Sequence, residues 1–413
     1  MSEKFQAPRG THDVLPSEQP RWQLIVGTLA EVAELYGYRR IQTPNFEDTE
    51  VFARTSGAGS DVVQKEMYTF EDRGGRSLTL KPEGTAPLAR AYIEHGLHRE
   101  AQPVKLYTVA PMYRYEAPQR GRYREHWQVS VEAFGSEDPA LDAEVIDLYS
   151  EFARRVGITD YVLQLNSIGD QNCRPAYLAQ LNAWLDEHAD ALDEDARQKR
   201  IRSPLRVFDV KNERVREALK AAPKIADHLC DACAAHFAEV RRVLDTLGIS
   251  YELEPTLVRG LDYYTRTVFE FINPKEKAQP QISSGGRYDG LIEQLGGPPT
   301  PGVGFGAGIE RALIALEAEN RTVEQPRLDV FFVLGEGAPR ERVLKLLHDV
   351  RRAGLSADTD YAGRSFKGQM TQAGRTGART VVIVRGEEAT LRRDGRDEQA
   401  VALDQVVATL TAR

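Results

Sequence analysis

The sequence predicts an α+β protein with a mixed, largely antiparallel sheet, a helical insertion and a C-terminal α/β domain. Strand-like and helical segments alternate too irregularly for a doubly wound α/β sheet. A charged, alanine-rich stretch at 170–248 interrupts the strands, and a new strand and helix pattern begins after residue 328. The length of 413 residues also indicates two or three domains rather than one core.

The first half of the chain is expected to supply one long helix and several strands. Apolar residues recur at helical spacing over 22–36, and Gly37 ends this helix. An extended run leads to Pro44, which belongs at the edge or end of a strand because proline cannot donate to a ladder. Further strands are predicted at 78–80, 104–110, 129–134 and within 258–271, and a helix is predicted at 141–156.

Two changes in composition mark domain boundaries in the rest of the chain. The first is the start of residues 170–248, which have a helical, highly charged pattern, and the second is the charged stretch 317–327. Beyond it, a strand at 329–334, a helix at 339–353 and a strand at 380–384 predict a small α/β domain. We therefore expect the first part of the main domain at 1–169, the insertion at 170–250, the second part of the main domain at 251–325 and the C-terminal domain at 326–413.

Composition argues against several classes of protein. Hydrophobic residues make up 41% and charged residues 28% of the chain, as in globular proteins. No apolar run approaches the roughly 18 residues that span a bilayer, and the N-terminus lacks the apolar core of a signal peptide. Three cysteines cannot all pair, so we expect a cytoplasmic protein without a disulfide framework or membrane contact.

The net charge of −8 is unevenly distributed along the chain. Residues 328–413 hold 14 Lys+Arg against 12 Asp+Glu, whereas the remainder holds 40 against 50. Five basic residues and no acidic one occur within 361–386, namely Arg364, Lys367, Arg375, Arg379 and Arg385. Such a run is more often a solvated face, but it is also the electrostatic footprint that a phosphate backbone requires.

Three arginine-bearing segments are the candidates for chemistry. They are RYEAPQRGRYR at 114–124, RGLDYY at 259–264 and GVGFGAGIER at 302–311. Guanidinium groups are planar, permanently charged forks for phosphate oxygens, and glycines let a ligand approach the backbone closely. The set could hold a triphosphate bent around its α-phosphorus. Taken singly, an arginine on a strand is more often half of a surface ion pair.

Commoner nucleotide-binding and hydrolytic motifs are absent from the sequence. The glycines at 302–308 superficially resemble a dinucleotide-binding fingerprint, but GGPPTP precedes them where that fold requires a hydrophobic strand. No P-loop, His-Glu-x-x-His or Gly-x-Ser-x-Gly sequence occurs either. These routes to ATP binding or hydrolysis are therefore set aside.

The same segments resemble the motifs of class II aminoacyl-tRNA synthetases. RYE at 114–116 with its arginine loop resembles motif 2, the helix and strand ending at Pro44 resemble motif 1, and GFGAGIER at 304–311 resembles motif 3. Segments peculiar to the histidyl-tRNA synthetases also have counterparts here: LVRGLDYY at 257–264, SSGGRYD at 283–289, RGTHD at 9–13 and KPEGT at 81–85. The resemblance covers essentially the whole chain, including the insertion and the C-terminal domain.

This resemblance implies ATP-dependent activation of L-histidine to histidyl-adenylate and transfer of histidine to the 3′ end of tRNA(His). Attack of a carboxylate on the α-phosphorus of ATP needs positioning and charge neutralisation more than a general base. Arg114 and Arg259 are implied to grip the α-phosphate from opposite sides, with Glu83 as the third catalytic residue. The implied ATP-binding residues are Arg114, Glu116, Arg122, His126, Arg259, Gly306 and Arg311. Mg²⁺ is expected only as the companion of ATP, with no tightly bound cofactor.

The resemblance also implies a histidine pocket. Glu83 and Thr85 would receive the α-amino group, while Glu132 and Tyr264 would read the imidazole, whose neutral form offers one donor and one acceptor nitrogen. Hydrogen-bonded recognition of this kind rejects apolar isosteres strongly. Taken alone, Glu132 would be an ordinary exposed carboxylate on a strand. The implied histidine-binding residues are Glu83, Gly84, Thr85, Arg114, Gln128, Glu132, Arg259, Tyr263, Tyr264 and Tyr288.

Motif 1 of this family implies a homodimer, and the C-terminal domain is implied to bind the anticodon. Arg364, Lys367, Arg375 and Arg379 are the corresponding tRNA-binding candidates. The sequence departs from the family pattern at Ala117, where arginine is common, and at EHWQ (125–128), where QFHQ is common. His126 would then stack on adenine in place of a phenylalanine, and with Ala117 the loop has one cation fewer for its contact with the tRNA acceptor end.

The cysteines leave a metal site open. CDACAAH at 230–236, together with Cys173, contains residue types that bind zinc. A fourth ligand close to them cannot be identified from the sequence, and buried or idle thiols are favoured in a helical insertion. We therefore expect no resident metal ion.

Two other functions compete with the synthetase reading. The nearest is a non-catalytic, histidine-binding regulator, but such paralogues typically lack the C-terminal domain and lose motif arginines, whereas Arg114, Arg259 and Arg311 are all present. The other is a plain tRNA-binding module, which would not need the paired Tyr263-Tyr264 and Glu83. A histidine-dependent ATP–pyrophosphate exchange assay separates these possibilities.

Overall fold

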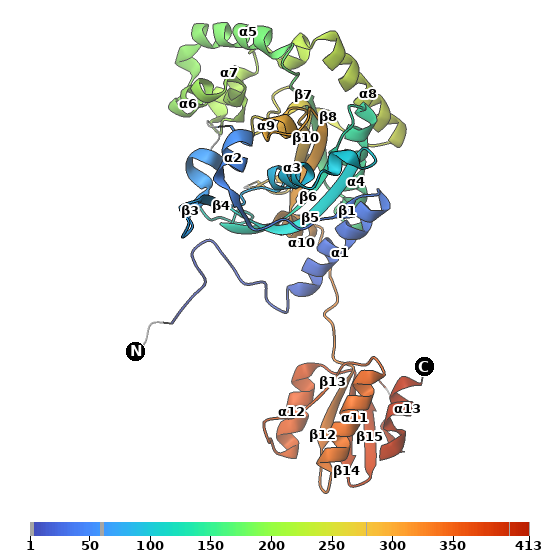
Figure 1. The fold of residues 1–413 in the computed structure, drawn as a ribbon. Coiled ribbons are helices and arrows are strands. Elements are labelled where there is room, and N and C mark those ends of the chain that lie inside the picture. Colours follow the sequence, from blue (N-terminus) through green and yellow to red (C-terminus); the bar gives the residue numbers. More distant parts are fainter. Residues whose placement is uncertain (1–3, 58–61, 278, 396, 413) are drawn as a thin grey trace. The chain divides into compact units, whose positions relative to one another are not determined.

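The fold is that of a computed structural model describing residues 4–57, 62–277, 279–395 and 397–412 (Figure 1). The chain divides into two compact units, Met1–Val323 and Glu324–Arg413. Among the described residues, no helix combines the length and the apolar character that a membrane crossing requires.

Unit 1 is built on a mixed sheet, which runs β1-β5-β6-β11-β10-β9-β7-β8 in the described chain. The strands are β1 (Arg39–Arg40), β5 (Val104–Tyr113), β6 (Glu125–Phe134), β11 (Gly302–Gly308), β10 (Gln281–Arg287), β9 (Thr265–Ile272), β7 (Val162–Ser167) and β8 (Glu252–Leu253). Each neighbouring pair from β5 to β7 is antiparallel, and the two edge strands β1 and β8 pair in parallel. The predicted mixed, largely antiparallel sheet is confirmed.

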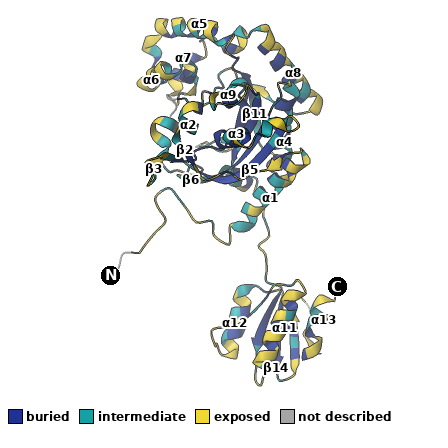
Figure 2. Cartoon of the chain, in the orientation of Figure 1, coloured by how far each residue is buried: buried dark blue, intermediate teal, exposed yellow. Residues whose placement is uncertain are grey.

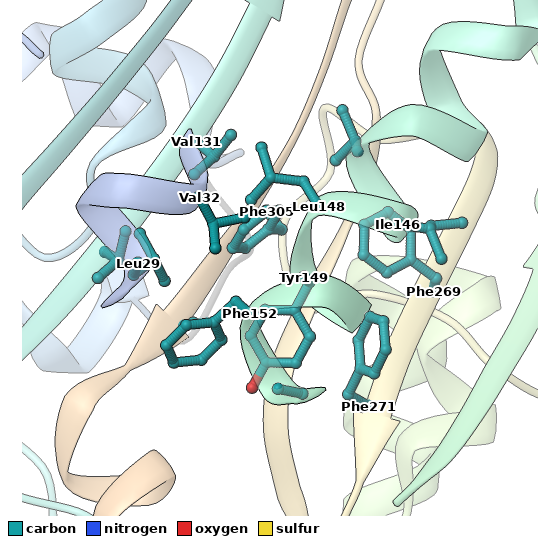
Figure 3. Close-up of a cluster of buried hydrophobic side chains, with 14 of the residues drawn as sticks. Leu29, Val32, Val131, Ile146, Leu148, Tyr149, Phe152, Phe269, Phe271 and Phe305 are labelled. Carbon is teal, nitrogen blue, oxygen red and sulfur yellow. The ribbon is translucent and has the colours of Figure 1, made fainter. Parts of the chain in front are cut away.

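One face of this sheet is covered by helices. They are α1 (Gln19–Leu35), α4 (Pro139–Val156), α8 (Asp231–Leu247) and α10 (Ile309–Ala318). Figure 3 shows Val131 and Phe305 of the sheet packed against Val32 of α1 and Leu148 of α4 in the main core. The helices predicted at 22–36 and 141–156 are confirmed. The first ends where Gly37 adopts a positive φ of 80°, a conformation that glycine favours.

The opposite face of the sheet carries the polar residues. Side chains alternate across a strand, so β6 buries Val129 and Val131 in the main core and directs Gln128 and Ser130 the other way. Helices α3 (Thr85–Glu94) and α9 (Leu291–Gln294) pack on part of this second face around a separate core. The remainder of this face is available for a site.

A small sheet with order β2-β4-β3 and a helical segment complete unit 1. The strands are β2 (Phe46–Asp48), β4 (Ser77–Leu80) and β3 (Tyr68–Glu71), with α2 (Thr49–Thr55) beside them. The helices between β7 and β8 are α5 (Arg174–Glu187), α6 (Glu194–Arg202), α7 (Glu213–Leu219) and α8. Helices α5–α7, at the top of Figure 1, surround a core of their own that includes Tyr177 and Leu181. The predicted helical character of 170–248 is confirmed.

Unit 2 is a small α/β unit whose sheet runs β13-β12-β14-β15-β16. Its elements are β12 (Val330–Leu334), α11 (Arg340–Arg352), β13 (Ala357–Thr359), α12 (Phe366–Thr376), β14 (Thr380–Arg385), β15 (Glu388–Arg393), β16 (Gln399–Ala402) and α13 (Val406–Thr411). Figure 2 shows its central strands largely buried and the outer faces of its helices exposed, and the edge strand β16 is mostly exposed. The predicted strand, helix and strand at 329–334, 339–353 and 380–384 are confirmed, and α12 and the other strands were not predicted.

Candidate functional site

A cavity of about 330 Å³ lies against the polar face of the main sheet. Arg114 and Arg122 reach it from the end of β5 and the following loop, Arg259 from the loop before β9, and Arg311 from the start of α10. The three arginine segments therefore meet at one place, although nearly 200 residues separate the first from the last. The other predicted site residues in its lining are Glu83, Thr85, Glu116, His126, Gln128, Tyr263, Tyr264 and Gly306.

Each guanidinium group in the cavity is oriented by fixed acceptors. Arg114 Nε donates to the Pro82 carbonyl at 2.8 Å. Arg122 forms an ion pair of 2.6 Å with Glu116. Arg259 forms an ion pair with Glu270. Arg259 Nη2 also donates to Ser284 Oγ at 2.5 Å. The N–H groups that these contacts do not use can bind a ligand of negative charge.

Arg311 has the most constrained position. Its guanidinium donates to the carbonyls of Gly121 and Gln281 at 3.1 and 3.0 Å. Burial, followed by repulsion from Arg122 and Arg114, lowers the pKa of Arg311 to about 10. At pH 7 the group is still charged, so several positive charges share one partly buried cavity. An anion of high charge would relieve this repulsion.

Glycines of β11 make room for the side chains of β6. A Cβ atom on Gly304 would clash with Glu132 and with the Val131 carbonyl, and one on Gly306 would lie 2.8 Å from Gln128 Nε2. Residues 302–308 therefore form a strand that must lack side chains on the face toward the site, and they are not a phosphate-binding loop. Its place in an antiparallel sheet confirms that it is not a dinucleotide fingerprint.

The carboxylate of Glu83 lies at the N-terminus of α3. It accepts the backbone N–H groups of Thr85 and Ala86, each at 2.8 Å. Burial raises the pKa of Glu83, and these two hydrogen bonds oppose that rise. The carboxylate is thus held rigidly at the cavity wall, facing the polar interior.

Three predicted histidine-binding residues, Gly84, Glu132 and Tyr288, lie outside the cavity lining. Glu132 and Tyr288 are almost fully buried, and the Tyr288 hydroxyl donates to Glu132. The other oxygen of Glu132 accepts from Thr85 Oγ1 at 2.6 Å. Burial, above all other causes, raises the pKa of Glu132 to about 8. A carboxyl group that is mostly neutral at pH 7 therefore stands one side chain behind the cavity wall.

The imidazole of His126 lines the cavity between cationic groups. Burial, and then the charges of Arg114 and Arg311, lowers its pKa to about 3. The ring is therefore neutral throughout the physiological range, which suits stacking on a nucleobase.

We predict that His126→Phe retains ATP–pyrophosphate exchange within a few-fold and gains stability at acidic pH. In the native state the ring stays neutral below its unfolded pKa of about 6.5, so its contribution to stability is lost as pH falls toward 3. Thermal unfolding of both proteins between pH 7 and pH 4 measures the difference, which should widen toward low pH. An equal pH dependence would contradict the assigned pKa.

Some lining residues were not predicted from the sequence. Glu270, Ser284 and Glu310 come from β9, β10 and α10, and Asp209 comes from the insertion. A sequence signal exists for Glu270, because it is a lone carboxylate between the buried Phe269 and Phe271 of the same strand. Asp209 gives no such signal, since only the folding of the insertion brings it to the cavity.

The remaining candidates lie elsewhere. Arg364, Lys367, Arg375 and Arg379 are exposed residues of unit 2. Arg364 forms an ion pair of 2.5 Å with Asp360, which lies just outside the basic run. His236 does not join the cysteines as a metal ligand, because its ring contacts Asp142 at 3.3 Å. That aspartate also pairs with the fully buried Arg287, so the arginine of SSGGRYD anchors the fold.

Comparison with known proteins places the chain in a family. The family model described as Histidyl-tRNA synthetase matches residues 10–312. A histidine–tRNA ligase of Desulforudis audaxviator is 49% identical over 381 residues, which are 92% of this chain and 91% of that protein. The apo histidyl-tRNA synthetase of S. aureus superposes with a TM-score of 0.83 at 37% identity, over 99% of this chain and 100% of that one.

A further solved structure shares the fold alone. It is described as an ATP phosphoribosyltransferase regulatory subunit/histidyl-tRNA synthetase from Bacillus halodurans, and it matches with a TM-score of 0.66 at 23% identity over 94% of this chain and all of its own. The higher identities and the family model together are decisive. The chain belongs to the histidyl-tRNA synthetases, a family of class II aminoacyl-tRNA synthetases.

Proposed function

We propose that the protein is a histidine–tRNA ligase, which activates L-histidine with ATP and transfers it to the 3′ end of tRNA(His). The observation that carries this proposal is the convergence of Arg114, Arg259 and Arg311 on one cavity that also contains Glu83 and Gln128. Family membership supplies the substrate class.

The cationic part of the cavity suits ATP. Arg114 and Arg259 hold the α-phosphate, and Arg122 and Arg311 hold the distal phosphates, since guanidinium groups neutralise the charge that develops during in-line displacement. Arg259 stays protonated because the Glu270 carboxylate raises its pKa against the opposing effect of burial. The Mg²⁺ that accompanies ATP supplies further charge neutralisation, and the lining carboxylate of Glu310 offers the oxygen ligands it prefers.

The carboxylate-rich part of the cavity suits histidine. Glu83 and Thr85 receive the α-ammonium group, and Arg114 receives the histidine carboxylate close to the α-phosphate. Tyr264 and Gln128 then face the imidazole, with Glu132 behind Thr85. Holding both reactants in this geometry lowers the barrier without a general base.

Histidine-dependent exchange of pyrophosphate into ATP, followed by charging of tRNA(His), tests this function. The ligase supports both reactions, and the other nineteen amino acids support neither. Binding of histidine without exchange would instead identify the protein as a non-catalytic regulator. Binding of tRNA without either reaction would identify a binding module.

We also propose the finer organisation expected from the sequence. The catalytic domain spans 1–169 and 251–325, the insertion spans 170–250, and an anticodon-binding domain spans 326–413. A cytoplasmic homodimer in contact with tRNA(His) is the corresponding working form. Light scattering of the purified protein tests the dimer, for which a mass of one chain would be the contrary result.

Removing residues 328–413 is expected to spare adenylate formation and weaken tRNA charging. The described cavity residues all lie in unit 1, whereas Arg364, Lys367, Arg375 and Arg379 lie in unit 2. Exchange should therefore stay within about threefold of the full chain, while the KM for tRNA(His) should rise at least about tenfold as phosphate contacts are lost. Equal loss of both activities would show that the removed part is needed for folding of the catalytic unit.

A further inference from the structure

Three cysteines and one aspartate meet at the base of the helical insertion. Asp170 and Cys173 lie between β7 and α5, and Cys230 and Cys233 lie at the start of α8. Asp170, Cys173 and Cys233 are buried, and Cys230 is half-buried. None of the four lines the cavity, so the proposed reaction makes no use of them.

The spacing of these groups matches a single metal ion with four ligands. One ligand atom from each residue lies within 4.8 Å of the other three. The Sγ atoms of Cys173 and Cys233 are 3.9 Å apart, and Cys173 Sγ is 3.7 Å from Asp170 Oδ1. Tetrahedral sulfur ligands at about 2.3 Å from Zn²⁺ are about 3.8 Å from one another. An iron–sulfur cluster, which distributes its thiolates over several irons, requires wider spacing.

The cysteines also occupy two unusual helix positions. Cys173 is the N-cap of α5 and Cys230 is the N-cap of α8, and neither side chain caps its helix. Serine, threonine, aspartate and asparagine are the usual residues there because their oxygens accept the free N–H groups. A helix N-terminus favours a thiolate, which is the form that binds metal. Both positions are explained if the sulfurs serve as ligands.

Neighbouring groups stabilise negative charge at the cluster. Three thiolates and a carboxylate around Zn²⁺ leave a net charge of −2. Arg266 Nη2 lies 3.5 Å from Asp170 Oδ2, and the backbone N–H of Asp170 donates to Cys173 Sγ at 3.2 Å. Such contacts from outside the ligand set orient the ligands and offset their charge.

We propose that Asp170, Cys173, Cys230 and Cys233 bind one Zn²⁺ ion as a structural site. The ion joins the two places where the chain enters the insertion and begins its last helix. It thereby holds the segment whose Arg206 donates to the Gly260 carbonyl and whose Asp209 lines the cavity. This replaces the sequence-based expectation that the chain has no resident metal.

Metal analysis of the untagged full chain tests the site directly. Protein purified under reducing conditions without chelator should contain about one zinc ion per chain, as measured by inductively coupled plasma mass spectrometry. Titration of its thiols with a mercurial should release that zinc in proportion. Replacement by Co²⁺ should give the visible absorption of a tetrahedral thiolate site.

Variants assign the ligands. Cys233→Ser should lower the zinc content at least about tenfold, and Asp170→Asn should weaken zinc retention against a chelator at least about tenfold. Asp231→Asn is the matched control, because Asp231 lies between the two cysteines of CDAC but is exposed and outside the ligand set. Its zinc content should equal that of the natural chain.

Three results would overturn the proposal. The first is that the chain of natural sequence binds neither zinc nor cobalt, even after reconstitution, while all three of its thiols are free. The second is a disulfide between two of the cysteines in freshly purified protein. The third is full zinc retention in both Cys233→Ser and Asp170→Asn. The first two results are measured on the natural chain. They therefore test the site even if a variant of a ligand residue does not fold.

Discussion

Arg259→His is expected to lower histidine-dependent ATP–pyrophosphate exchange by about 10²- to 10³-fold, the usual cost of removing one preorganised group that stabilises developing charge. Arg259 lines the cavity and is positioned by an ion pair with Glu270 and a hydrogen bond of 2.5 Å to Ser284 Oγ. Histidine is shorter, carries no permanent charge and cannot offer the same fork to the α-phosphate. The loss should appear in kcat as well as in kcat/KM, because the contact strengthens as the reaction proceeds.

Stability must be measured beside activity for this variant. Glu270 is half-buried, and removing its partner leaves a poorly compensated carboxylate, so the melting temperature should fall even if the fold is kept. Arg242→His is the matched control, since Arg242 pairs with Glu239 on the exposed surface of α8. Its exchange activity should equal that of the unchanged chain. Full activity of Arg259→His would contradict the role assigned to Arg259.

The elements that the sequence predicted are those with strong local signals. The long helices α1 and α4 have apolar stripes at helical spacing, and the alternation in β6 is visible along the chain. Strands β10 and β11 were not recognised, because serine and glycine have low strand propensity. Their positions are determined by neighbouring strands on both sides, which is information that a local pattern lacks.

The residues of the candidate site likewise fall into those that could be predicted from the sequence and those that could not. The arginines could be found because they belong to dispersed motifs that resemble one family. The groups that orient them, such as Glu270 and the Pro82 carbonyl, could not, because those contacts exist only after the sheet has formed. Asp170 lies between these two cases, because its spacing pattern is visible in the sequence but its partners are not. Asp-x-x-Cys at 170–173 has the same spacing as Cys-x-x-Cys at 230–233, but only the structure brings the pairs together.

The second large effect is expected at Glu132. Because burial raises its pKa to about 8, this carboxyl group is mostly protonated at neutral pH in the free protein. A carboxylate accepts hydrogen bonds more strongly than a neutral carboxyl group does, and Glu132 accepts from the Thr85 hydroxyl at the cavity wall. Ionisation of Glu132 therefore strengthens the polar wall that faces the imidazole, so kcat/KM for histidine should rise with pH until it levels off above about 8. Glu132→Gln should abolish that rise and lower kcat/KM by about 10- to 100-fold, chiefly through KM. Exchange measured from pH 6 to pH 9 at subsaturating histidine gives both quantities.

The stability of the same variant independently checks the direction of the pKa shift of Glu132. Between about pH 4.5 and about pH 8 the folded protein holds a proton on Glu132 that the unfolded chain releases, so this group makes the fold less stable as pH rises. Glu132→Gln should therefore flatten the pH dependence of the melting temperature in that window.

Glu310, a buried carboxyl group that lines the cavity, provides a test that distinguishes histidine recognition from a general electrostatic effect. Burial raises the pKa of Glu310 to about 7, and this residue accepts the Trp127 N–H at 2.9 Å beside Arg311. Glu310→Gln should change the KM for ATP more than that for histidine, the reverse of Glu132→Gln. If Glu132→Gln instead lowers only stability and leaves the histidine KM and its pH dependence intact, Glu132 serves to hold Thr85 and Tyr288 in place. Recognition of the ring would then rest on Gln128 and Tyr264, which line the cavity directly.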